Sequence, residues 1–333
     1  MFLLAFTLFA GSSVLLALVV SDALAGRGNA FIAPPAVVEA AESVVDASVS
    51  AAPIEEAVAE AVVAEPGDSS ATIAPLSGDR LAVVGGDPRL HSAILDAVAG
   101  AGGSTSVVVL RLGDGLAAEV DGDGQYYAAS LFKLAILYEA ERRISLGEFS
   151  LDSPVLYTAE AFAEDLGTVG SLSFSDDGTI PLGDALAAMV EISDNSSAIA
   201  IVRMLGPGTV DETMRSLGLE VTSVNTTELP TTARDMARLM QAIVNGEGVT
   251  ETQRQHMRQL LLGQHTRDGI PAGLPEGIVS GNKTGTWDGA THDVAFVDAP
   301  GGEYVIAVLT DRGWDWPTIA NVSAAVYGVL LDE

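Results

Sequence analysis

Apolar residues follow different patterns in different parts of the chain. In residues 87–103 they recur at helical spacing and end in glycines, and in residues 104–115 and 116–124 they form short runs bounded by Gly and Asp. These patterns predict one helix followed by two strands. Helical spacing then dominates from about residue 129 to residue 262. It is clearest in the segments 182–192, 195–206, 209–219, 231–246 and 250–263.

Short apolar runs return near the carboxyl end of the chain. They predict strands at residues 278–287, 291–299 and 303–311, the last two joined as a hairpin through APGGE, and a final helix at residues 318–331. Both ends of the chain therefore supply strands, whereas the middle supplies helices. This order predicts an α+β fold: an antiparallel sheet flanked by helices, with an inserted all-α region at about residues 129–248.

The amino-terminal segment has the composition of an export signal. Residues 2–20 hold no charge, and residues 23–25 (Ala-Leu-Ala) form a small-x-small pattern that a signal peptidase could cut. The apolar run is also near the length that spans a bilayer. We expect residues 1–27 to be a signal peptide or a membrane anchor, and the protein to be exported to the periplasm or the cell exterior. An uncleaved segment 2–20 would tether it to the membrane.

Residues 28–79 are rich in Ala, Val, Glu, Pro and Ser. They contain nine acidic residues and no basic one. Self-repulsion and the low aromatic content predict a disordered acidic linker, because such a segment buries too little apolar surface to offset its chain entropy. Residues 80–333 remain as the folded domain.

Charge and composition exclude several classes of function. The 333-residue chain has 48% hydrophobic residues, enough for a sizeable core, and a formal net charge of -29 that would repel nucleic acid. The absence of cysteine excludes disulfides, thiolate metal sites and a thiol nucleophile. The four histidines lack metal-ligand spacing, so neither a metal nor another cofactor is expected.

The chain has only two lysines, and one of them lies in an apolar run. Lys133 belongs to the segment AASLFKLAIL, whereas 14 of the 16 basic residues are Arg. In a helix Ser130 and Lys133 would share one face, with Ser130 beside the free N–H groups of the first turn. Burial disfavours an ammonium ion and lowers its pKa, so Lys133 is a candidate general base for Ser130.

Two further motifs make the pair of Ser130 and Lys133 a specific indication of function. Residues 193–195 are Ser-Asp-Asn, between two predicted helices, and residues 283–285 are Lys-Thr-Gly, on a predicted strand. With Ser130 and Lys133 they resemble the Ser-x-x-Lys, Ser-Asp-Asn and Lys-Thr-Gly elements of class A serine β-lactamases and penicillin-recognising enzymes. The three elements occur in the order of that family, and the resemblance covers roughly residues 81–333.

The resemblance implies catalytic roles for four residues. Ser130 would attack the amide carbonyl and form an acyl-enzyme, with Lys133 as the proton acceptor. The backbone N–H groups of Ser130 and Thr286 would form the oxyanion hole. Ser193 would pass a proton to the departing nitrogen.

It also implies four residues that bind substrate. Lys283 would attract the substrate carboxylate and assist Ser193, and Thr284 would hydrogen-bond the same carboxylate. Asn195 would hold the side-chain amide of the substrate and orient Lys133. Gly285 would let the strand approach the substrate closely.

One family element is missing. Class A enzymes use a glutamate in a Glu-x-x-Leu-Asn pattern to activate the water that hydrolyses the acyl-enzyme, and the corresponding segment here, residues 220–230 (EVTSVNTTELP), is short and lacks the pattern. Glu228 is the nearest carboxylate candidate for that base. A solvated loop acid is the competing interpretation.

The favoured function is therefore a β-lactamase-type serine hydrolase that opens β-lactams through a Ser130 acyl-enzyme. A D-Ala-D-Ala carboxypeptidase, or a related peptidoglycan enzyme acting on stem peptides, would use the same residues. A penicillin-binding sensor domain without hydrolytic activity is the third possibility. A monomer is expected in each case.

Overall fold

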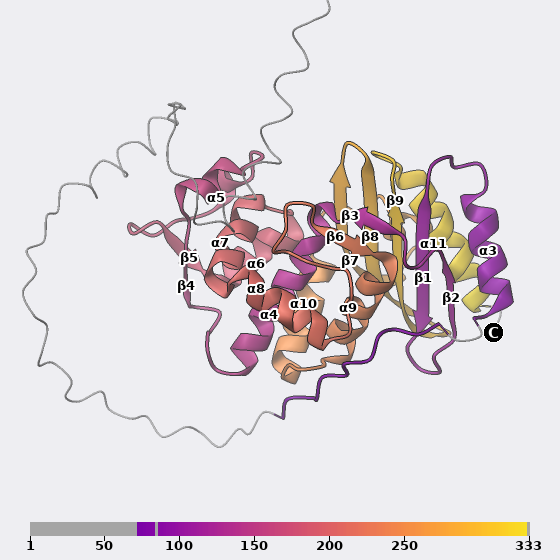
Figure 1. The fold of residues 1–333 in the computed structure, drawn as a ribbon, viewed down its shortest axis with the longest axis horizontal. Helices are drawn as coiled ribbons and strands as arrows, with labels where there is room; N and C mark the ends of the chain where they lie inside the picture. The colour runs from indigo at the N-terminus through magenta and orange to yellow at the C-terminus, as the bar shows by residue number, and fades with distance from the viewer. Residues whose placement is uncertain (1–71, 84–85, 332–333) are drawn as a thin grey trace, which may run out of the picture. The chain divides into compact units, whose positions relative to one another are not determined.

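A computed structural model describes residues 72–83 and 86–331. The predictions for residues 1–27, and those for the linker up to residue 71, lie outside the described residues. The described residues form an antiparallel five-stranded sheet in the order β2-β1-β9-β8-β7 (Figure 1). Its strands are β1 (Thr105–Arg111), β2 (Ala117–Val120), β7 (Val279–Trp287), β8 (Ala290–Ala299) and β9 (Gly302–Thr310).

Both faces of this sheet are buried, which explains the short continuous apolar runs in its strands. In β1, Val108 and Leu110 belong to one apolar cluster, whereas Val107 and Val109 belong to a second cluster on the opposite face. The alternation follows from the two-residue period of a strand. Because helices cover each face, apolar residues are favoured at consecutive positions.

Helices α3 (Pro88–Val98) and α11 (Trp316–Leu331) pack together against one face of the sheet. Helix α9 (Ala233–Asn245) packs against the other face, and the remaining helices lie on that side (Figure 1). The strands come from both ends of the domain, and the helical region separates β3 from β7. The α+β prediction is therefore confirmed.

The helical region is built around α4 (Phe132–Ser145), whose residues from 133 to 141 are all buried. The other elements here are α5 (Ala159–Ala163), α6 (Leu182–Glu191), α7 (Asn195–Leu205), α8 (Pro207–Ser216) and α10 (Glu251–Leu262), with η2 (Ala129–Leu131) and η3 (Val169–Ser171). The 3-10 helix η4 (Ile270–Gly273) instead packs against α11 on the opposite face of the sheet. Two small sheets accompany the helices: β3 (Gln125–Tyr127) with β6 (Pro230–Thr232), and β4 (Pro154–Leu156) with β5 (Thr179–Pro181). Strands of three residues are too short to show a period in the sequence.

Residues before position 80 contact the folded domain. The backbone oxygens of Ser77 and Asp79 accept hydrogen bonds from the guanidinium of Arg238, and Gly248 N donates to Ala74 O at 2.8 Å. The compact unit therefore includes residues 72–79, which composition alone assigned to the acidic linker. Within the described residues, no helix has the length and apolar character needed to cross a membrane.

A buried carboxylate fixes the short segment that precedes β6. Asp235, in the first turn of α9, accepts hydrogen bonds from the backbone N–H groups of Glu220, Val221 and Thr222, and from the Thr222 hydroxyl. Its side chain is almost completely buried. Asp235 therefore anchors the start of the segment, while Asp211 on α8 accepts hydrogen bonds from Ser223 and Val224 further along it.

Replacing Asp235 by Ala should lower the free energy of unfolding by about 3 kcal/mol, because several donors lose a charged acceptor in a buried place. Chemical denaturation monitored by circular dichroism measures the change. Glu212→Ala is the control, since Glu212 is an exposed acid on the neighbouring helix α8. A loss in Asp235→Ala no larger than in this control would contradict the assigned role.

Candidate active site

Ser130 lies at a sharp turn where β3 meets the central helix. It occupies the middle of the 3-10 turn η2, which leads directly into α4. The preceding residue, Ala129, has a φ of 45°, a left-handed conformation that costs a non-glycine residue about 1–3 kcal/mol. The turn is held from outside by Ala128 N, which donates to Leu229 O at 2.8 Å. The strained backbone at Ala129 thus belongs to the turn that positions the Ser130 hydroxyl.

Lys133 extends beneath that hydroxyl and is fully buried. Its Nζ lies 3.1 Å from Ser130 Oγ, 2.6 Å from Asn195 Oδ1 and 2.6 Å from the backbone oxygen of residue 193. Burial lowers the pKa of Lys133 well below its usual range, and the charge of Lys283 lowers it further. A neutral amine at this distance is able to accept the proton of the Ser130 hydroxyl.

Ser193 belongs to the turn between α6 and α7 and also has a left-handed backbone, with a φ of 59°. Its Oγ lies 3.2 Å from the amine of Lys133 and 3.0 Å from the amine of Lys283. The next residue, Asp194, caps α7 by accepting from Ser197 N, and it also accepts from the Thr168 hydroxyl. The Ser193 hydroxyl therefore bridges the two lysines of the chain.

Lys283 reaches this hydroxyl from strand β7, and its side chain is fully buried. Burial lowers the pKa of Lys283 to about 7, although attraction to Asp293 on β8 opposes the shift. Burial likewise raises the pKa of Asp293 to about 7. Its carboxylate is held by Asn282 Nδ2 at 2.9 Å and by Ile270 N at 2.8 Å. Near neutral pH, Lys283 is thus close to the point at which it gains or loses its charge.

Gly285 brings β7 against the Ser130 turn. A Cβ atom at this position would lie 2.9 Å from the backbone oxygen of Ala128 and 3.2 Å from Ser130 N. Both neighbours are backbone atoms, which do not move aside cheaply. The glycine therefore permits close contact between the strand and the turn, and its role in letting the strand approach the substrate stays a prediction.

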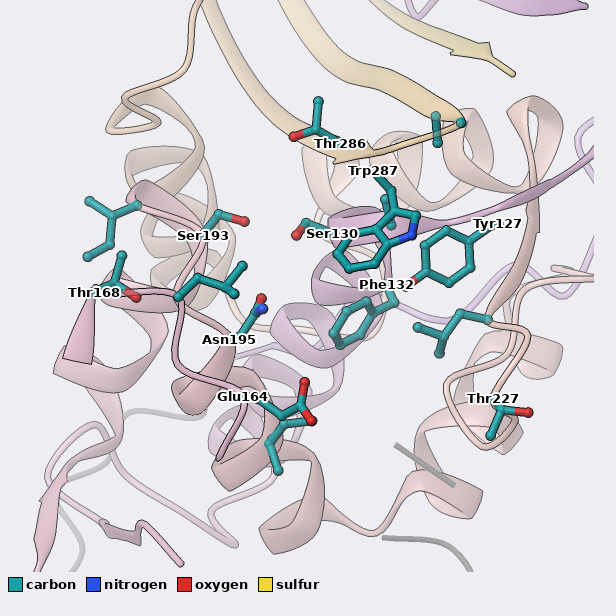
Figure 2. Close-up of a pocket in the computed structure, with 17 residues that line it drawn as sticks. Tyr127, Ser130, Phe132, Glu164, Thr168, Ser193, Asn195, Thr227, Thr286 and Trp287 are labelled. Carbon is teal, nitrogen blue, oxygen red and sulfur yellow. The ribbon is translucent and has the colours of Figure 1, made fainter. Parts of the chain in front are cut away.

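These groups open onto a cavity of about 530 Å³ (Figure 2). Ser130, Ser193, Asn195 and Thr286 line it, and Figure 2 shows the two serine hydroxyls facing each other. Lys133, Lys283 and Thr284 are buried and are not among the lining residues. The other lining residues are Tyr127, Ala129, Phe132, Glu164, Leu166, Thr168, Ile192, Ile199, Thr227, Leu229, Trp287, Gly289 and Ala290.

The acid predicted as the water-activating base differs from the acid that lines the cavity. Glu228 is exposed and is not a lining residue, although its neighbours Thr227 and Leu229 are. Its assignment remains a prediction. Glu164, at the end of α5, does line the cavity, and burial raises the pKa of its carboxyl. No motif in the sequence singled out Glu164, because its position depends on the packing of α5 against α7.

Within the described residues, no group of His, Cys, Asp or Glu is arranged to hold a metal ion.

Comparison with known sequences identifies relatives of part of the chain. The Escherichia coli β-lactamase Toho-1 is 35% identical over 135 residues, which cover 36% of this chain and 46% of that protein. A β-lactamase of Proteus vulgaris is 31% identical over 180 residues, or 49% of this chain and 63% of the relative. The chain thus matches about half the length of these curated relatives.

Solved structures extend the similarity over most of the domain. PBP-A has a TM-score of 0.69 and 25% identity, and the alignment covers 79% of this chain and 100% of PBP-A. A variant of PBP-A, described as an acyl-enzyme complex with penicillin G, has a TM-score of 0.68 and 26% identity, with 73% and 97% coverage.

A family model described as "Beta-lactamase enzyme family" matches residues 89–330, well over half of the chain. The match agrees with the three motifs and with the shared fold. The protein therefore belongs to the beta-lactamase enzyme family and is similar to class A serine β-lactamases.

Proposed function

We propose that this family member opens the amide bond of β-lactams through an acyl-enzyme on Ser130. One observation carries the proposal: hydrogen bonds join Ser130 Oγ, Lys133 Nζ, Ser193 Oγ and Lys283 Nζ in an unbroken series beside the cavity. A nucleophile, a base of lowered pKa, a relay hydroxyl and a cation are the groups that an acyl transfer of this kind requires.

In the proposed first step, Ser130 Oγ attacks the lactam carbonyl carbon while its proton passes to Lys133 Nζ. The backbone N–H groups of Ser130 and Thr286 stabilise the negative oxygen that forms. The carbon–nitrogen bond then breaks, and the proton moves from Lys133 through Ser193 Oγ to the leaving nitrogen. The products of this step are an ester on Ser130 and a neutral amine, and Lys133, Ser193 and Lys283 regain their starting protonation.

The substrate carboxylate would bind near Lys283, with Thr284 as the further partner predicted from the family pattern. Asn195 would hold the side-chain amide of the substrate, and its Oδ1 already orients Lys133. The substrate class is therefore an amide with a nearby carboxylate on its leaving side. The apolar segment 2–20 supports the further proposal that the protein acts after export.

The fate of the acyl-enzyme separates two candidate functions. Hydrolysis needs a base for water, and the exposed position of Glu228 beside the lining residues Thr227 and Leu229 favours a slow second step. Slow release of the ester would correspond to a second candidate: a D-Ala-D-Ala carboxypeptidase, or a penicillin-binding domain, that is acylated by β-lactams but hydrolyses them poorly.

Replacing Ser130 by Ala should abolish both nitrocefin turnover and covalent labelling by a fluorescent penicillin, because no nucleophile remains. Ser104→Ala is the control, since Ser104 is exposed and precedes the distant strand β1. Labelling that survives in Ser130→Ala would refute the proposed nucleophile.

Intact mass, followed after benzylpenicillin is added, distinguishes the two candidates. A hydrolase should lose its adduct within seconds, and Glu228→Gln should then trap the adduct while acylation stays fast. An adduct that persists for hours selects the carboxypeptidase or binding function. Unchanged turnover in Glu228→Gln would remove Glu228 from the mechanism.

The rate constant kcat/KM for acylation by benzylpenicillin should fall as the pH rises above about 7. Lys283 is charged below its pKa of about 7 and neutral above it, so the attraction for the substrate carboxylate is lost on the alkaline side. If the charge is essential, the loss is about tenfold per pH unit. Lys283→Arg should flatten this limb, because a guanidinium stays charged throughout the range. The same decline in Lys283→Arg would show that another group titrates.

Replacing Gly285 by Ala should lower the acylation rate by about tenfold or more, because the added Cβ would push β7 away from the Ser130 turn and shift Thr286 N. Stopped-flow acylation measures the effect. Gly113→Ala is the matched control, since a Cβ at Gly113 has open space around it. Equal rates in both variants would show that the contact does not position the oxyanion hole.

A further inference from the structure

Glu164 is the only carboxylic acid among the described residues that line the cavity. It follows the last residue of α5 and is half-buried. Within the described part of the chain, its carboxylate forms no hydrogen bond or ion pair with another side chain. Burial raises the pKa of this carboxyl, and no neighbouring cation opposes the shift. The fold therefore holds a carboxylate in the cavity wall without supplying a cation for it.

The surroundings of Glu164 are mainly apolar and aromatic. Phe132, Leu166 and Tyr127 belong to the same lining, and the charge of Glu164 raises the pKa of the Tyr127 hydroxyl, in addition to the effect of burial. Figure 2 shows Glu164 on the far side of Asn195 from Thr286. The carboxylate thus faces the end of the cavity opposite to the oxyanion hole and β7.

The loop that follows Glu164 is firmly held. The side chain of Asp165 accepts hydrogen bonds from the backbone N–H groups of Gly167, Thr168 and Val169 at 2.8–3.0 Å. The Thr168 hydroxyl donates to Asp194, the residue between Ser193 and Asn195. Glu164 is therefore tied, through its own loop, to the turn that supplies the relay hydroxyl.

The two ends of the cavity consequently lie near side chains of opposite charge. Lys283 lies behind the lining near β7, and Glu164 lies in the opposite wall. A carboxylate in a partly apolar site gains little from water and gains most from a charged hydrogen-bond donor on the ligand. The matching ligand has its carboxylate on the leaving side of the amide and a cation on the acyl side.

We infer that Glu164 selects acyl donors whose side chain bears an ammonium group. The inference rests on the proposed acylation of Ser130 and adds the class of substrate: β-lactams with an α-amino group on the acyl side chain, and peptides with a free amino group in the same place. Glu164 acts here as a specificity-determining residue, and it binds the substrate before any bond breaks.

Three penicillins that differ at one carbon test the inference. Benzylpenicillin has hydrogen there, ampicillin has an ammonium group and carbenicillin has a carboxylate. Second-order acylation rate constants would be measured by stopped flow at about pH 6.5, below the pKa of about 7.7 for an α-amino group. We expect ampicillin to react about fivefold faster than benzylpenicillin, and carbenicillin to react slowest, as for one partly screened charge pair.

Glu164→Gln should bring the ampicillin to benzylpenicillin ratio close to one and raise the rate with carbenicillin. Glu160→Gln is the matched control, because Glu160 lies on α5, just before Glu164, and carries the same charge but pairs with Arg203 and does not line the cavity. The control should retain the ratio of the unchanged protein, and loss of selectivity in both variants would overturn the role of Glu164.

Two other outcomes would also overturn the inference. One is equal rates for the three penicillins in the unchanged protein. The other is a Glu164→Gln variant that keeps the rate ratio but prolongs the adduct in intact mass, which would make Glu164 a base for hydrolysis. If none of the three compounds acylates the protein, the proposed function itself fails.

Discussion

Two buried amines share one hydroxyl group, and the remainder of the active site depends on this contact. Lys133 and Lys283 both lie beside Ser193 Oγ, at 3.2 Å and 3.0 Å. Outside the protein both would be ammonium ions at neutral pH. Burial and their mutual repulsion make the doubly charged state costly, so the pKa of Lys133 falls well below its usual range. A residue type that usually forms surface ion pairs thereby becomes a candidate base.

The fold bears the cost of this arrangement through its core. Apolar side chains surround both amines, so each is accommodated only because it finds acceptors: Lys133 at Ser130, Ser193 and Asn195, and Lys283 at Ser193 and the backbone oxygen of Thr284. The left-handed backbone at Ala129 and Ser193 adds about 1–3 kcal/mol of strain at each residue. Packing elsewhere in the domain must offset the cost of burying the two amines and the cost of the backbone strain. Such a balance fits the frequent conflict between activity and stability at enzyme sites.

The charge of the whole protein gives these lysines further weight. With a net charge of -29, the chain repels anions in general, yet the proposed substrates carry a carboxylate. Attraction of a substrate carboxylate therefore has to come from a nearby cation, and Lys283 lies where β7 meets the cavity. Under the inference drawn for Glu164, its carboxylate provides the opposite charge in the opposite wall, and the two groups together would distinguish the two ends of a ligand more sharply than either alone.

Sequence patterns alone determined the α+β class, the buried helix at Ser130 and the identity of the motif residues, because helical and strand periods and short motifs are local properties. They left Glu164 unnoticed, since its place in the cavity wall depends on the packing of α5 and on the loop held by Asp165. They also could not reveal the strained turns at Ala129 and Ser193, or that Gly285 is needed for contact with the turn at Ala128. Only the tertiary structure decided these features, because each arises from contacts between segments that are distant in the chain.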